Sequence, residues 1–238
     1  MKSRLTSCTL TRNDKDRYLP EVLENLSKFV DSMIILDDCS DDGTWEWLVD
    51  CNVKHLYSNK LAIYRMDEPT FYSNELKIRK RMWDLTKEHM NPGMFREFII
   101  INDSDEIIPE QDHYKVKEFI DDPNSVVAIS DLFNMWSEDE YRVDGAWAPI
   151  NSKRRLFAYR DSDEWLYERA FACGEVPKYV YDSSCRQTGI RIKHLAYSKE
   201  EDRIRKHKIY MEVDGGKYHA KWHLDSIIQQ PTLEKWID

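Results

Sequence analysis

The sequence is short of glycine, proline and long apolar runs, and each shortage excludes a class of protein. Only 7 glycines and 8 prolines occur in 238 residues, which argues against flexible linkers between domains. No apolar run approaches the roughly 18 residues that a membrane span needs. Residues 1–14 contain no continuous apolar core of the kind that a secretory signal carries. We find no internal repeat and no low-complexity segment.

Paired cysteines are also lacking. The five cysteines are odd in number and show no CxxC spacing. This pattern favours reduced thiols over a disulfide framework or a zinc site, so we expect a cytoplasmic protein.

What is present is a composition that can build a sizeable core, with 41% hydrophobic and 33% charged residues. The net charge of -9 is unevenly spread, because residues 186–223 hold ten Lys or Arg against five Asp or Glu. This stretch is either a solvated helix face or a basic surface for an anionic partner. The tail, residues 222–238, contains two tryptophans and either packs on the core or makes a homodimer contact.

Apolar spacing predicts strands that alternate with helices through the first 130 residues. Strands are expected at 4–10, 33–36, 60–66, 98–101 and 125–130, and helices at 19–30, from Thr44, around 78–85 and at 113–121. This alternation predicts a doubly wound α/β sheet, in which ligands bind beyond the carboxyl ends of the strands. We expect residues 131–238, with strands at 154–159 and 190–197 and a helix at 199–212, to be a C-terminal elaboration of the same domain.

Two of the predicted strands end in carboxylates. The strand at 33–36 runs directly into Asp37 and Asp38, and the strand at 98–101 is followed by Asp103 and Asp105. Both endings should lie at the same edge of the sheet, so they suggest one site. Carboxylate oxygens are ligands that Mg²⁺ and Mn²⁺ prefer, and these ions bridge to phosphate oxygens.

These motifs resemble a known family. The string "ILDDCSDDGT" resembles the nucleotide-binding segment of the GT-A-fold glycosyltransferases of family 2, and "INDSDE" resembles their DxD motif. The segment "TLTRND" is similar to their opening segment, with Arg12 in place of the usual aromatic residue. The resemblance covers residues 5–110 and extends more weakly to about 210.

The resemblance implies a Rossmann-like mixed sheet with helices on both faces. It also implies a metal-dependent inverting enzyme that moves a hexosyl or pentosyl group from a nucleotide-sugar donor, with a UDP-sugar as the first choice. The expected acceptor is a hydroxyl of a saccharide, a protein or a modified nucleic-acid base.

The resemblance also assigns roles to the nucleotide-binding residues. Asp38 would hydrogen-bond the base of the nucleotide. Arg79 would lie near the nucleotide, and Asp103 would approach the ribose or the sugar. The base pocket would be lined by Thr9, Leu10 and Thr11. For Asp41 and Asp42 we prefer turn formation and capping of the helix that begins near Thr44.

The metal, Mn²⁺ or Mg²⁺, would bind Asp105, with Asp103 beside it. The string "IRIKHLAY" resembles the family's strand that ends in His-x-Gly-Tyr, with Ala196 in place of the glycine. His194 is therefore either a hydrogen-bonded core residue or a third contact to the metal or the diphosphate.

An inverting displacement needs one general base. The segment "RRLFAY" resembles the family's Arg-Leu-Phe segment, which in some members leads to a His-Glu pair. Here Tyr167 and Glu168 stand in that place, so Glu168 is the first choice for the base, with Glu164 and Asp163 behind it. The alternative is a surface carboxylate paired with Arg169 or Arg160.

Two other functions are compatible with the predicted fold. One is a non-catalytic module that binds a nucleotide or a partner. The other is a nucleotidyltransferase, which would normally show a glycine-rich loop near the first strand, and "CTLTRNDKD" contains no glycine. That absence favours the sugar transferase.

Overall fold

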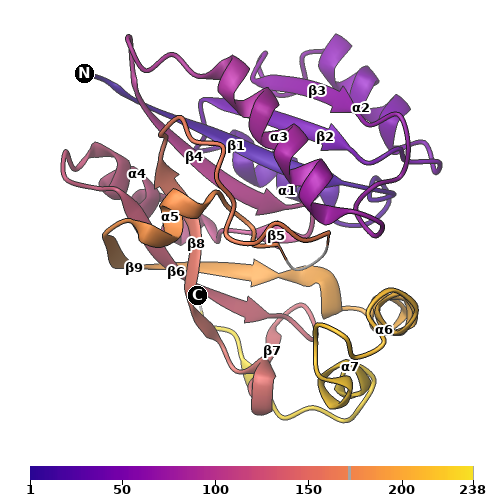
Figure 1. Ribbon diagram of the computed structural model, residues 1–238. Helices are drawn as coiled ribbons and strands as arrows, with labels where there is room; N and C mark the ends of the chain where they lie inside the picture. The colour runs from indigo at the N-terminus through magenta and orange to yellow at the C-terminus, as the bar shows by residue number, and fades with distance from the viewer. Residues whose placement is uncertain (171–172, 238) are drawn as a thin grey trace.

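The computed structural model describes residues 1–170 and 173–237. Its main feature is one curled, mixed sheet with strand order β3-β2-β1-β4-β8-β6-β9-β5 (Figure 1). The strands of this sheet are β1 (Ser3–Thr11), β2 (Ser32–Asp37), β3 (Leu61–Arg65), β4 (Arg96–Asp103), β5 (Glu106–Ile107), β6 (Val127–Asn134), β8 (Ile150–Ala158) and β9 (Cys185–His194). A small second sheet pairs β7 (Glu140–Arg142) with β10 (Leu233–Lys235).

Helices cover both faces of the sheet, as the alternating pattern predicts. Apolar side chains of α1 (Leu19–Ser27), α2 (Thr44–Val53) and α4 (His113–Asp121) form one core layer with the sheet. Those of α3 (Glu75–His89) and α5 (Lys178–Asp182) form the core on the opposite face. Helices α6 (Glu200–Val213) and α7 (Lys221–Ser226) lie together beyond the end of the sheet (Figure 1).

The strand order explains why the two acidic strand ends meet. Strand β1 lies between β2 and β4 and is parallel to both, so the chain turns to opposite sides of β1. Thr11 is in register with Asp37, and Leu10 with Asp103. The carboxyl ends of all three strands therefore share one edge, at a switch point of the strand order.

The elements of the first half lie close to their predicted positions, and α4 and the start of α2 agree to the residue. The second half differs in detail. Residues 195–197 of the predicted strand at 190–197 form a short 3-10 turn, and β9 begins earlier, at Cys185, because it pairs with β6 over a longer stretch. The expected division after residue 130 falls inside β6, so both parts of the chain contribute to one sheet.

The tail packs on its own chain, which is one of its two predicted roles. Strand β10 pairs with β7, and the Trp236 ring lies edge-on to Phe133 with ring centroids 5.1 Å apart. Nearby, the Arg142 guanidinium lies over Trp136 and Trp147, at 4.6 and 5.1 Å from the ring centroids. This aromatic cluster fixes the region from which α6 and α7 extend. The homodimer contact stays a prediction.

All five cysteines are free thiols, in agreement with their odd number and spacing. Within the described ranges, no helix combines the length and the apolar character that crossing a membrane requires.

Candidate active site

A cavity of about 740 Å³ opens at the carboxyl edge of β1, β2 and β4. Both acidic strand ends line it, through Asp38 on one side and through Asp103 and Asp105 on the other. Helix α6 contributes Arg205 and Lys206 to the opposite wall, so part of the basic stretch lines the cavity. The structure thus brings residues from the first, middle and last thirds of the chain to one site.

Asp38 is buried beside the cavity and organises one of its loops. Its carboxylate accepts the backbone N–H groups of Thr70 and Phe71, at 2.7 and 3.0 Å, and lies 3.9 Å from the Arg12 guanidinium. Burial nevertheless raises the pKa of Asp38, and the two N–H donors and Arg12 offset this only in part. The loop held in this way places Phe71 and Tyr72 in the cavity wall.

The other predicted nucleotide contacts divide into two groups. Leu10, Thr11 and Arg79 line the cavity. Arg79 donates to Glu75 at 2.7 Å. Thr9 is fully buried and does not line the cavity, because β1 continues for two more residues before it ends at Thr11.

The remaining carboxylates of the first acidic loop serve local structure, as predicted. Asp42 accepts the backbone N–H and the hydroxyl of Thr44, at 2.9 and 2.6 Å, and so stabilises the turn from which α2 begins. Asp41 accepts from the Asn13 side chain at 2.8 Å.

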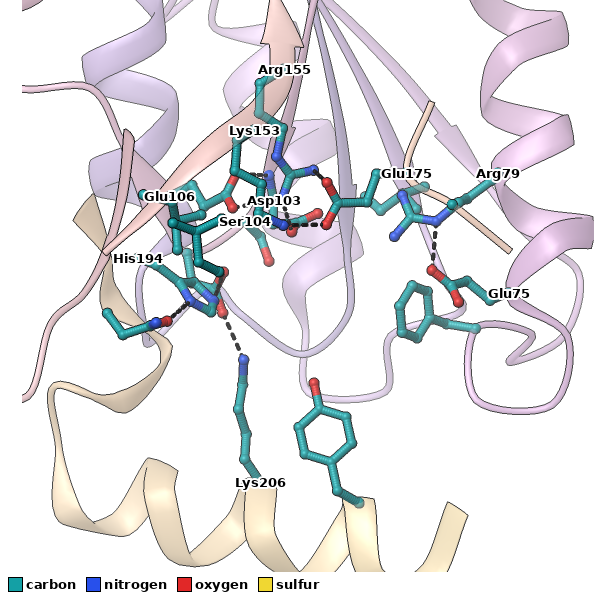
Figure 2. Close-up of a pocket in the computed structure, with 18 of the residues that line it drawn as sticks. Glu75, Arg79, Asp103, Ser104, Glu106, Lys153, Arg155, Glu175, His194 and Lys206 are labelled. Atoms are coloured by element: carbon teal, nitrogen blue, oxygen red, sulfur yellow. Dashed lines mark hydrogen bonds and ion pairs between the residues drawn. The ribbon is translucent and has the colours of Figure 1, made fainter. Parts of the chain in front are cut away.

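Asp105 lies at the centre of a buried polar group. Its Oδ2 is 3.2 Å from Lys206 Nζ, and its Oδ1 is 3.5 Å from His194 Nε2. Burial alone would raise the pKa of Asp105, but Lys206 and His194 outweigh it and hold that pKa well below its usual range. Figure 2 shows Lys206 reaching from α6 towards His194.

The donor set around Asp105 fits a divalent ion. His194 Nδ1 lies 2.8 Å from Asn134 Oδ1, and this contact orients the ring so that Nε2 faces Asp105, where Nε2 would serve as a ligand once an ion displaced any proton on it. A carboxylate oxygen and an imidazole nitrogen therefore face the same point. Among the residues that the structure describes, no group of three or more His, Cys, Asp or Glu side chains is arranged to hold an ion. An ion at Asp105 and His194 would take its remaining ligands from substrate and water.

Arg155 on β8 holds together three carboxylates of the cavity wall. It is 2% exposed, and its Nη2 lies 2.8 Å from Asp103 and 2.7 Å from Glu106, while its Nη1 lies 3.5 Å from Glu175 (Figure 2). Lys153 also pairs with Glu175, at 2.6 Å. Burial favours the neutral form of Glu175, but Arg155 and Lys153 outweigh it and lower its pKa to about 2. The sequence signal for Arg155 was an arginine directly before Leu-Phe, at the point where β8 changes from polar to apolar residues.

A second network ties the DxD loop to the first loop and to α6. The Ser104 hydroxyl donates to Asp14, which also pairs with Arg17. Arg17 reaches Asp202 on α6 at 2.9 Å, and the Tyr18 hydroxyl donates to the same carboxylate at 2.7 Å. These contacts fix the first turn of α6 relative to the acidic loops.

The three predicted general bases do not line the cavity, and their catalytic role stays a prediction. Glu168, Glu164 and Asp163 are exposed, and none of them lines the cavity. Glu168 pairs with Lys80 at 2.8 Å and Asp163 pairs with Lys87, both on α3, so they serve as surface ion pairs. The sequence also allowed a surface carboxylate paired with Arg169 or Arg160. The observed partners of Glu168 and Asp163 are instead lysines that only the tertiary fold brings near.

Known structures match the whole fold. No protein-family model matches the chain, and no curated protein sequence does either. TarS of S. aureus superimposes with a TM-score of 0.53 and 17% identity over 94% of this chain and 42% of that one. TarS 1–349 in complex with UDP superimposes with a TM-score of 0.52 and 15% identity, over 94% of this chain and 69% of that one. The mannosyltransferase PcManGT from Pyrobaculum calidifontis, in complex with GDP-Man and Mn²⁺, superimposes with a TM-score of 0.54 and 12% identity. The match covers 96% of this chain and 70% of that one.

These similarities establish the fold. The chain has the Rossmann-like GT-A fold, a mixed sheet with helices on both faces, as the sequence motifs predicted. The chain spans only about two fifths of the longer TarS chain, at 42% coverage.

Proposed function

We propose that this protein is a metal-dependent inverting glycosyltransferase that uses a nucleoside diphosphate sugar. The observation that carries the proposal is the meeting of Asp38 with Asp103 and Asp105 in one cavity, together with the basic residues Arg79 and Lys206. A nucleoside diphosphate needs a polar pocket for its base and positive charge for its phosphates, and this cavity provides both. The UDP complex of TarS and the GDP-Man complex of PcManGT, on the same fold, support the assignment.

The donor would lie along the carboxyl edge of the sheet. Its base would bind near Asp38 and Thr11, and its diphosphate would lie between Asp105 and Arg79. Asp105 and His194 would hold Mn²⁺ or Mg²⁺; the presence of Mn²⁺ in the PcManGT complex favours the former. When bound, the ion would neutralise charge on the leaving nucleoside diphosphate. Asp103, held by Arg155 at 2.8 Å, would face the ribose or the transferred sugar.

Glu175 replaces Glu168 as the proposed general base. Among the described residues of the segment 159–182, it is the acidic one that lines the cavity. In the displacement, the acceptor oxygen forms a bond to the anomeric carbon, the bond from that carbon to the diphosphate breaks, and Glu175 takes the acceptor proton. Arg155 and Lys153 keep Glu175 ionised but lower its basicity, so for Glu175 to act as the base these ion pairs must weaken when the acceptor binds.

The acceptor would enter through the part of the cavity that is farthest from the nucleotide pocket. The exposed side chains of Tyr167 and His219 line the cavity, and Trp147 contributes to its wall. Flat aromatic surfaces of this kind pack against sugar rings, which favours a saccharide over a protein or a nucleic-acid base as acceptor.

The test is donor turnover. The protein is incubated with UDP-, GDP- and CDP-sugars and Mn²⁺, and released nucleoside diphosphate is measured. We expect release from one donor class, loss of release in EDTA and in Asp105→Ala, and a fall of about 10²- to 10⁴-fold in Glu175→Gln. The matched control, Glu168→Gln, should stay near wild type.

Other outcomes would assign a different function. Tight UDP binding with no release from any donor would indicate the non-catalytic module. Release of pyrophosphate from a nucleoside triphosphate would indicate a nucleotidyltransferase.

A further inference from the structure

Lys206 occupies a position that is unusual for a lysine. Its side chain is only 15% exposed, and its ammonium group lies 3.2 Å from Asp105 Oδ2 and 5.0 Å from the centroid of the Tyr197 ring. Lysine is rarely buried unless it is paired, and here the pair is made with the carboxylate that the metal would use.

The contacts of Asp105 put an ammonium group directly beside the point at which a divalent ion would bind. One carboxylate oxygen faces His194 Nε2 at 3.5 Å, and the other is in contact with Lys206. His194 is itself fixed by Asn134 at 2.8 Å, so its nitrogen is aimed at the same carboxylate. An ion bound between Asp105 and His194 would lie next to the Lys206 ammonium, and two cations at such a distance repel strongly in a buried site.

The side chain of Lys206 can move without its helix. The first turn of α6 is anchored, because Asp202 accepts hydrogen bonds from Arg17 and Tyr18 at 3.0 and 2.7 Å. The lysine side chain, in contrast, is a flexible four-carbon chain with a mobile ammonium group. Beside it lies the open cavity, where a diphosphate would place its oxygens.

We infer that Lys206 occupies the cation position at Asp105 in the donor-free protein. When the metal and the donor bind together, the lysine side chain swings away from Asp105 and its ammonium group contacts the diphosphate. Lys206 thereby makes metal binding depend on the nucleotide, because an ion without a diphosphate must displace the lysine with nothing to receive it. This inference rests on the proposed function. It adds a residue of α6 that positions the diphosphate and sets the order of binding.

The test measures Mn²⁺ binding to the full chain by the loss of the free Mn²⁺ signal in electron paramagnetic resonance, first without nucleotide and then with UDP. In the absence of nucleotide, Lys206→Met should bind Mn²⁺ more tightly than wild type by about 5- to 150-fold, the usual range for coupling between two ligands. With Mn²⁺ present, the same variant should bind UDP more weakly than wild type. Lys208→Met is the matched control: it removes an equal charge from an exposed position on the same helix and should change neither affinity.

An unchanged or weaker Mn²⁺ affinity of Lys206→Met without nucleotide overturns the inference, as does an equal gain in Lys208→Met. Failure of the proposed function gives a different result. In that case UDP binds neither wild type nor variant, while the comparison of Mn²⁺ affinities without nucleotide still reports on Lys206.

Discussion

Replacing Arg155 by methionine tests the network that holds the cavity wall. Arg155 contacts Asp103, Glu106 and Glu175, and Glu106 is 1% exposed. Removing one partner of a buried ion pair typically costs about 3–5 kcal/mol, because the remaining charge is left in a poorly solvating environment. We therefore expect Arg155→Met to lower the free energy of unfolding by about 4 kcal/mol.

This loss should be visible in thermal unfolding followed by circular dichroism. The entropy of unfolding is about 2 cal/mol/K per residue, which makes 1 kcal/mol equivalent to about 2 °C for a domain of this size. The expected fall in Tm is thus about 6–10 °C. The Tm of Arg155→Lys should lie between those of wild type and Arg155→Met, since a single ammonium group cannot reach three carboxylates in the way a guanidinium does.

The neighbouring arginine provides the control. Arg154 lies on the same strand and places its guanidinium 5.6 Å from the centroid of the Tyr181 ring. A contact of this kind contributes about 0.5–1 kcal/mol, so Arg154→Met should lower Tm by only about 1–2 °C. If Arg155→Met melts within about 2 °C of wild type, or no lower than Arg154→Met, the network does not stabilise the fold as we argue.

Three further substitutions probe individual carboxylates. Asp105→Asn should abolish metal-dependent turnover and weaken Mn²⁺-dependent UDP binding, as measured by calorimetry; full activity of this variant in EDTA would exclude the metal model. Asp38→Asn should raise the donor KM by about 10- to 100-fold, because the Thr70 and Phe71 N–H groups bind different carboxylate oxygens and the amide replaces one of these with an NH2 donor; an unchanged KM would contradict that role. The folded pKa of Glu175, about 2, lies below its ordinary value of 4.5, so its contribution to stability is present above pH 4.5 and is lost as the pH falls towards 2. Urea titrations should show that the free energy of unfolding falls less over this pH range in Glu175→Gln than in wild type. The same pH dependence in both proteins would refute the low pKa of Glu175.

Local sequence pattern determined much of the fold. The apolar runs before Asp37 and before Asp103 define β2 and β4, because a strand buried on both faces needs continuous apolar side chains. The start of α2 at Thr44 follows the turn that Asp42 and Gly43 form directly before it. The convergence of the two acidic strand ends was also predictable, because parallel neighbours in such a sheet end at one edge.

Only the tertiary structure decided how charged side chains pair over long sequence separations. The partners Asp105 and Lys206 are 101 residues apart, and Asp103 and Arg155 are 52 apart, and no periodicity encodes either contact. That Glu175 lines the cavity and Glu168 does not depends on how the segment after β8 folds, and this segment has no regular spacing from which its direction can be read. Hydrophobic periodicity fixes which face of an element is buried, whereas the position of a carboxylate in a loop depends on the cations that the completed fold places around it.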